Sequence, residues 1–215
     1  MDLLDLAIRS FVTFLVVIDP IGTAAVFVGI AAHEAPRARR RSAIRGVIIA
    51  TIVLLGFAFL GEPLLRALGI GLPAFRIAGG ALLFLLAIDM VFARRTGLRA
   101  TTPGEEAEAA EREDVAVFPL AIPLLAGPGA ITSVLLLAGG GPAGGPEAMM
   151  HLGVVVGVLL AVMIASLVCL LAADLLARGL GETGVNVVSR LLGLLLAALA
   201  VQFVADGVMA FLPMN

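Results

Sequence analysis

Hydrophobic residues fall into six long runs along the chain, separated by shorter polar segments. The runs cover about residues 6–32, 43–60, 73–93, 115–138, 151–177 and 186–212. Each exceeds the ~17 residues that an α-helix needs to cross a bilayer, and the strict alternation of a membrane β-barrel is absent. The pattern therefore predicts an all-α membrane protein with six transmembrane helices.

The fourth run contains residues that interrupt a helix in its middle. Pro119, Pro123 and Pro128 lie inside the apolar segment, and Gly127 and Gly129 flank the last of them. A proline removes a backbone N–H and pushes against the carbonyl one turn earlier, while glycine removes the side chain that would stiffen the helix. We therefore expect two half-helices with a short stretch of open backbone, which survives at membrane depth where it is buried in protein or lines a wet cavity.

The first run is interrupted in the same way, by Asp19-Pro20-Ile21-Gly22-Thr23. Asp19 follows Ala7 by 12 residues, about 18 Å along a helix and close to the middle of a ~30 Å hydrocarbon core. A carboxylate at that depth is costly and is a functional candidate by default. Three interpretations stay open: a substrate or proton site, an N-cap for the half-helix that Pro20 opens, and a buried partner for an arginine.

The two halves of the chain resemble each other around these interruptions. Pro20 and Pro128 are 108 positions apart, and Gly80 and Gly193 open similar apolar runs 113 positions apart. An odd number of spans in each half inverts the second copy, so we expect two inverted three-helix repeats with the first and fourth helices broken. The expected organisation is a first repeat at 1–93, a charged linker at 94–114 and a second repeat at 115–215.

The candidate substrate-binding residues lie at the two interruptions. They are Asp19, Pro20, Gly22, Thr23, Gly127, Pro128, Gly129 and Thr132. The threonine hydroxyls either cap freed carbonyl groups or touch a ligand. Asp89 and Gln202, in the third and sixth runs, are further polar contacts to consider; Asp89 also suits an interfacial pair with Arg94 or Arg95.

Composition excludes a soluble protein and sets an orientation. The 215 residues are 61% hydrophobic and 14% charged, with a mean hydropathy of +1.14. All 14 basic residues are arginine. With six spans, 11 of them lie in or beside the loops after the first, third and fifth runs, which predicts that the 94–114 linker is cytoplasmic and that both termini lie on the periplasmic or extracellular side.

Chemistry-bearing side chains are sparse. There is a single cysteine, Cys169, and no HExxH or cysteine–histidine ligand spacing. No nucleophile–base set can be found either. We therefore expect no enzyme activity, no metal, no cofactor and no nucleic-acid partner.

The motifs resemble those of the MarC family of bacterial inner-membrane proteins. The resemblance rests on Asp19-Pro20-Ile21-Gly22, where many members carry asparagine first, and on the run from Pro119 to Gly129. It is supported by Gly79-Gly80 and by Ala200 to Phe203. The resemblance implies six spans in 3+3 inverted repeats, and for members of the SnatA type it implies translocation of glycine, alanine and similar amino acids.

Two function classes follow from this pattern. The first is a secondary transporter of small neutral amino acids, in which the half-helix N-termini after Pro20 and Pro128 bind the carboxylate and Asp19, or carbonyls near Gly127, binds the ammonium. The alternative is a non-transporting membrane protein, either a lipid-handling protein or membrane enzyme or a stress-response scaffold. A pocket at mid-depth between the two breaks would favour the transporter.

Overall fold

The computed structural model describes residues 2–92, 115–141 and 144–211, and the regular elements in this part are helices. The predicted linker at 94–114 lies outside the described residues. The helices are α1 Leu3–Ile18, α2 Pro20–Ile30, α3 Pro36–Ala67, α4 Leu72–Val91, η1 Ala116–Leu125, α6 Pro128–Ala138, α7 Gly145–Leu171 and α8 Ala173–Phe211.

The first hydrophobic run forms two helices that meet at one residue. α1 begins after Asp2, whose carboxylate accepts a hydrogen bond from the Leu4 N–H, and ends at Ile18. α2 begins at Pro20, a favourable first helical residue because its missing N–H would have no partner there. The two helices together form one 28-residue apolar segment long enough to cross a membrane.

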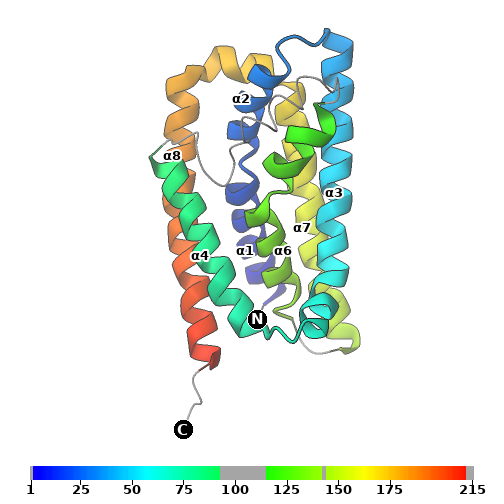
Figure 1. Cartoon of the computed structure of the whole chain (residues 1–215), viewed down its shortest axis with the longest axis vertical. Helices are drawn as coiled ribbons and strands as arrows, with labels where there is room; N and C mark the ends of the chain where they lie inside the picture. Colours follow the sequence, from blue (N-terminus) through cyan, green and yellow to red (C-terminus); the bar gives the residue numbers. More distant parts are fainter. Residues whose placement is uncertain (1, 93–114, 142–143, 212–215) are drawn as a thin grey trace.

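The fourth run forms a bent pair of helices. η1 is a wide, π-type helical segment in which Phe118 and Ile122 have extended backbone, and each of these residues precedes a proline. The chain then restarts as α6 at Pro128, and the axes of η1 and α6 differ by 54°. Figure 1 shows the pair running from the end of the molecule where α4 finishes to the opposite end.

Five helical segments are long and apolar enough to cross a membrane, and the bent pair makes six if it is one span. The five are Leu3–Ile30, Pro36–Ala67, Leu72–Val91, Gly145–Leu171 and Thr183–Phe211. The all-helical membrane architecture expected from the hydrophobic pattern is therefore confirmed. Large apolar side chains on the outer surface, such as Ile52, Ile164 and Leu194, are more than half exposed. A surface of this kind is stable in apolar surroundings such as a bilayer.

The boundary between the fifth and sixth runs differs from the prediction. α7 ends at Leu171 rather than at 177, and α8 starts two residues later. The first part of α8, from Ala173 to Leu180, forms an arm that crosses one end of the molecule in Figure 1. Gly181, with a φ of 62°, turns the chain into the long descending part of α8. Glycine adopts this left-handed conformation without the steric cost of a side chain.

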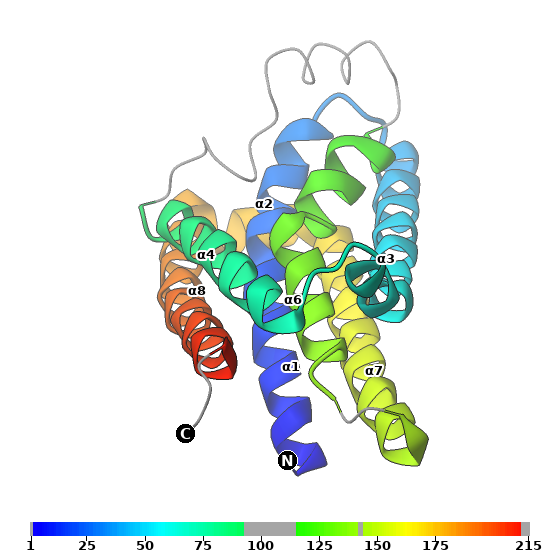
Figure 2. The same cartoon turned by 60° about the horizontal axis from the view of Figure 1, so that its bottom comes forward.

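The broken segments lie at the centre of the molecule. In Figures 1 and 2, α1–α2 and η1–α6 run side by side in opposite directions, with α3 and α7 on one side and α4 and α8 on the other. α4 and α8 form a close pair, because Gly80 lies directly against the backbone of Ala200: a Cβ at Gly80 would sit 2.8 Å from the Ala200 carbonyl oxygen. Small residues allow such close approach of helices in membranes.

Candidate functional site: two helix breaks at the centre of the bundle

Asp19 joins α1 to α2 and has an unusual backbone conformation. Its φ is 47° and its ψ is 69°, so it is left-handed, and it is the single non-glycine residue with positive φ in the part of the chain that the structure describes. Its N–H donates to the Leu15 carbonyl at 3.0 Å and closes α1, while its Oδ1 accepts the Gly22 N–H at 3.0 Å and caps α2. Aspartate and asparagine tolerate this conformation best among residues with a side chain, because their short polar groups bond to the local backbone.

The second carboxylate oxygen of Asp19 reaches another helix. Ser189, on α8, donates its hydroxyl to Asp19 Oδ2 at 3.3 Å. Asp19 is only 2% exposed, so both oxygens of a nearly buried carboxylate have polar contacts. The side chain therefore connects the first helix break to the last helix of the protein.

Gly22 and Thr23 complete the first break. A Cβ at Gly22 would overlap the Asp19 carboxylate, so the cap requires glycine at this position. The Thr23 hydroxyl donates to the Ile18 carbonyl at 2.9 Å, which is one of the carbonyls freed where α1 ends. Of the two roles considered for Thr23, the structure shows the capping role.

The second break leaves a helix N-terminus to which no described side chain contributes a capping acceptor. Gly127 is the N-cap of α6, and among the described residues no side chain bonds to the first turn there. Ile131 N–H bonds back to the Gly127 carbonyl at 3.0 Å, which leaves the Gly129 and Ala130 N–H groups in the unpaired first turn. Gly127 itself lies against the Pro123 carbonyl, leaving no room for a side chain. Such an N-terminus is a natural binding place for an anion.

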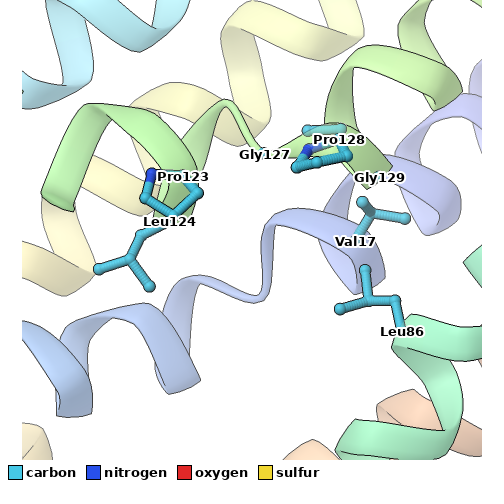
Figure 3. Close-up of a pocket in the computed structure, with 8 residues that line it drawn as sticks. Val17, Leu86, Pro123, Leu124, Gly127, Pro128 and Gly129 are labelled. Carbon is cyan, nitrogen blue, oxygen red and sulfur yellow. The ribbon is translucent and has the colours of Figure 1, made fainter. Parts of the chain in front are cut away.

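A small cavity lies beside this N-terminus. Its volume is about 10 Å³, and Figure 3 shows its lining. The lining residues are Val17, Leu86, Pro123, Leu124, Gly127, Pro128, Gly129 and Ala130. This volume accommodates about one water molecule. The space belongs mainly to the second break, since Val17 is the one lining residue that comes from the end of α1.

The two breaks are neighbours in space. A Cβ at Gly129 would lie 3.2 Å from Val17 Cγ1 and 2.8 Å from Leu86 Cδ2. Val17 is two residues before Asp19, so the start of α6 lies next to the end of α1. Figure 3 shows the Val17 and Leu86 side chains below Gly129, from α1 and α4 respectively.

The remaining predicted residues lie in three different environments. Thr132 is buried against Gly79 of α4, one turn into α6. Asp89 is half-buried in the last turn of α4. Gln202 is exposed and donates to Asp206 at 2.7 Å, one turn further along α8. The structure therefore does not bring Gln202 to the helix breaks.

Six residues of this region were not among the predicted site residues. Pro123 lines the cavity but was expected only to interrupt a helix. Four others line the cavity but look like any other apolar residue in a spanning run: Val17, Leu86, Leu124 and Ala130. Ser189 lay at the start of the sixth run, 170 positions from Asp19, and sequence spacing carries no sign of their contact. Ser189 lies beside Arg190 at the polar start of the sixth run, so its hydroxyl did not stand out there.

Among the described residues, no group of three histidine, cysteine, aspartate or glutamate side chains lies close enough to hold a metal ion. The chemistry of the site rests on one carboxylate, two hydroxyl groups and backbone N–H groups.

Comparison with known proteins gives consistent matches over nearly the whole chain. The profile of the MarC family integral membrane proteins matches residues 4–212. The chain is 36% identical over 201 residues to the UPF0056 inner membrane protein YhgN of Escherichia coli (strain K12), covering 94% of this chain and 95% of that protein. It is 36% identical over 202 residues to the UPF0056 membrane protein MJ1677 of Methanocaldococcus jannaschii, with the same coverage.

A UPF0056 membrane protein of Aquifex aeolicus is 35% identical over 203 residues, or 94% of this chain and 92% of the relative. No solved structure matches the chain. The family profile, the relatives and the apolar helices agree: the chain belongs to the MarC family of integral membrane proteins.

Proposed function

We propose that this protein is a secondary transporter that moves small neutral amino acids, such as glycine and alanine, across the inner membrane. The observation that supports it is the pair of adjacent helix breaks, one with a buried carboxylate and the other with a helix N-terminus that no described side chain caps. Interrupted helices at the centre of a membrane bundle are the usual place for substrate sites in secondary transporters. The inner-membrane location agrees with the name of the relative YhgN, an inner membrane protein.

A zwitterionic amino acid suits the chemistry of these two breaks. Its carboxylate can accept the free N–H groups of Gly129 and Ala130, where the α6 dipole also favours negative charge. Its ammonium can approach Asp19, replacing the long hydrogen bond from Ser189 at Oδ2. The N-terminus of α2 is less suited to the substrate carboxylate than the sequence indicated, because Asp19 already caps it.

The packing around the second break restricts the substrate to a small side chain. Gly129 lies against Val17, Leu83 and Leu86, and the cavity walls are apolar apart from the backbone. A site that is packed this tightly selects substrates by the size of their side chain, because each additional methylene that does not fit weakens binding. Glycine and alanine are the amino acids with the smallest volume.

The proposed site would have to open before it binds substrate. A cavity of about 10 Å³ is too small for any amino acid, so binding requires α1 and α6 to separate, or α4 to withdraw Leu86. Transport by alternating access needs states of this kind, in which the site is sealed before it opens to either side.

The arrangement of the helices supports an inverted repeat. α1–α2 and η1–α6, the first spans of the two proposed repeats, run antiparallel at the centre, and α4 and α8, the third spans, form an antiparallel pair. A transporter built from two inverted halves places related broken helices across a central axis in this way.

The decisive experiment is counterflow of labelled alanine in proteoliposomes. Vesicles loaded with unlabelled alanine should accumulate labelled alanine transiently when they contain the protein, and excess glycine should compete while excess leucine should not. Empty vesicles and vesicles with Gly129→Leu protein serve as controls. An absence of accumulation with a correctly inserted, helical protein would refute the proposal for alanine and favour a non-transporting function.

A further inference from the structure

A second, larger cavity lies away from the helix breaks, at the end of the molecule crossed by the α8 arm. Its volume is about 450 Å³. Phe27 of α2, Ala43 of α3 and Leu170 of α7 close it from below and are almost fully buried. Pro36 of α3 and Leu171 of α7 also line it and are exposed, so they supply most of the apolar surface of its floor.

Charged side chains surround the same cavity. Arg39 and Arg40, in the first turns of α3, line it together with Asp174 of the α8 arm. Arg39 and Asp174 form an ion pair that joins α3 to the arm. Arg40 forms no ion pair with any residue in the described ranges. The three groups together carry a net charge of +1, and Arg40 is the one among them that has no ion-pair partner in the described ranges.

The depth of the cavity corresponds to the headgroup layer of a bilayer. From Arg45 to Glu62 no charged residue interrupts α3, a length of about 25 Å that matches most of the hydrocarbon core. Arg39 precedes Arg45 by six residues, so it lies about 9 Å beyond that apolar part. The phosphate groups of a bilayer centred on this apolar part of α3 would lie at this level.

Exposed leucines of the same region face outward. Leu171, at the edge of the cavity, is 46% exposed, and Leu175 of the α8 arm is 73% exposed. The arm has leucines on its outer face, and Asp174 on its other side pairs with Arg39 of α3. This is the pattern of a helix that lies in the membrane interface. The cavity thus combines basic groups, an apolar floor and an interfacial opening.

We propose that this cavity is a binding site for the phosphodiester headgroup of an anionic phospholipid. Arg40 binds the phosphate, Arg39 adds a second donor while it stays paired with Asp174, and the glycerol and upper acyl carbons pack on Pro36 and Leu171, the exposed apolar residues of the lining. Basic pockets between transmembrane helices bind anionic headgroups in this way. A net charge of +1 complements the single negative charge of a phosphatidylglycerol headgroup.

The experiment measures lipid binding by native mass spectrometry. The purified full chain is delipidated, incubated with equal amounts of phosphatidylglycerol and phosphatidylethanolamine, and the affinity of the first bound lipid is determined. Phosphatidylglycerol should bind preferentially. Arg40→Gln should weaken that binding about tenfold, which corresponds to the loss of one charge-assisted hydrogen bond.

Two further variants separate a specific site from general surface charge. Arg37→Gln removes the same charge from an exposed position on α3 that does not line the cavity, and it should leave the binding unchanged. Asp174→Asn frees Arg39 and raises the net charge of the cavity to +2, so it should strengthen binding several-fold. Circular dichroism and the melting temperature of each variant verify that the fold is kept.

Three results would overturn the proposal. Equal weakening by Arg37→Gln and Arg40→Gln would show diffuse attraction to the arginine-rich end. Weaker or unchanged binding in Asp174→Asn would exclude Arg39 from the site. Displacement of the lipid by inorganic phosphate at a similar concentration would show that the cavity takes a soluble anion instead.

Discussion

Asp19 combines three local roles at one position. It closes α1, caps α2 and holds a left-handed backbone, and its second oxygen accepts the Ser189 hydroxyl. Asparagine is the one substitution that can keep the first three roles, because it tolerates the left-handed region and caps about as well as aspartate. What asparagine removes is the negative charge.

Asp19→Asn and Asp19→Ala should therefore differ in kind. Asp19→Asn should keep the melting temperature and lower the apparent affinity for alanine by roughly ten- to a hundredfold if the charge binds the ammonium, since hydrogen bonds to charged groups contribute ~1.5–3 kcal/mol. Asp19→Ala should in addition lower the free energy of unfolding by about 2 kcal/mol. The cap of α2 is lost, and alanine is strained in the left-handed conformation that this position requires. Counterflow assays and thermal unfolding in detergent measure the two effects.

The pH profile of uptake distinguishes the charge from the cap. If Asp19 carries a coupling proton, the pH dependence of alanine uptake should flatten in Asp19→Asn. An Asp19→Asn protein with unchanged affinity and an unchanged pH profile would limit Asp19 to capping. Substrate binding would then depend on the backbone groups at the start of α6.

At the scale of secondary structure, the break before α6 depends on glycine for space rather than for flexibility alone. A methyl group at Gly129 would lie within 3.3 Å of Val17, Leu83 and Leu86, and one at Gly127 would overlap the Pro123 carbonyl. The same packing that makes the cavity small also makes it sensitive to one additional carbon atom.

Ser133, one turn along α6, has a buried hydroxyl without a hydrogen-bond partner in the described part of the structure.

Gly129→Ala should lower alanine counterflow more than it lowers expression. Forcing one methyl group into a packed site costs about 1–3 kcal/mol, and here the methyl group fills the cavity beside the α6 N-terminus. Radiolabel counterflow, normalised to the amount of reconstituted protein, measures the effect.

Gly157→Ala provides the matched control on α7. A Cβ there would meet nothing within 4 Å, so this variant should keep transport and gain slightly in stability from the higher helix propensity of alanine. Equal loss of transport and expression in Gly129→Ala would mean that this glycine serves folding alone.

At the scale of the whole molecule, the arginines gather at one end. The first turns of α3 carry five arginines between Arg37 and Arg45, and the α8 arm at the same end carries Arg178. α1 begins and α8 ends at the other end. By the positive-inside rule, the arginine-rich end should face the cytoplasm.

This orientation can be tested with reporter fusions. Alkaline phosphatase fused after Asn215 should be active, because that enzyme folds after export, and a green fluorescent protein fused at the same position should stay dark. The same two reporters inserted between Ala32 and Pro36 should give the opposite result. A fluorescent fusion after Asn215 would reverse the proposed sidedness.

The hydrophobic pattern by itself determined that this is a multi-pass helical membrane protein, and its motifs pointed to the MarC family. Both follow from local physics: a bilayer requires long apolar helices with satisfied backbones, and proline and glycine interrupt such helices wherever they occur. The positions of the candidate residues around Pro20 and Pro128 were therefore visible in the sequence.

Only the tertiary structure decided which of these residues meet. Apolar spans align with one another in many registers, so the contact of Gly129 with Val17, the bond from Ser189 to Asp19 and the position of Gln202 on the outer face were not visible in the sequence. The early end of α7 and the arm of α8 were likewise hidden, because Leu175, Leu176 and Leu180 of the arm continue the apolar pattern of the neighbouring spans. Composition records how apolar a segment is, whereas packing decides what each apolar face covers.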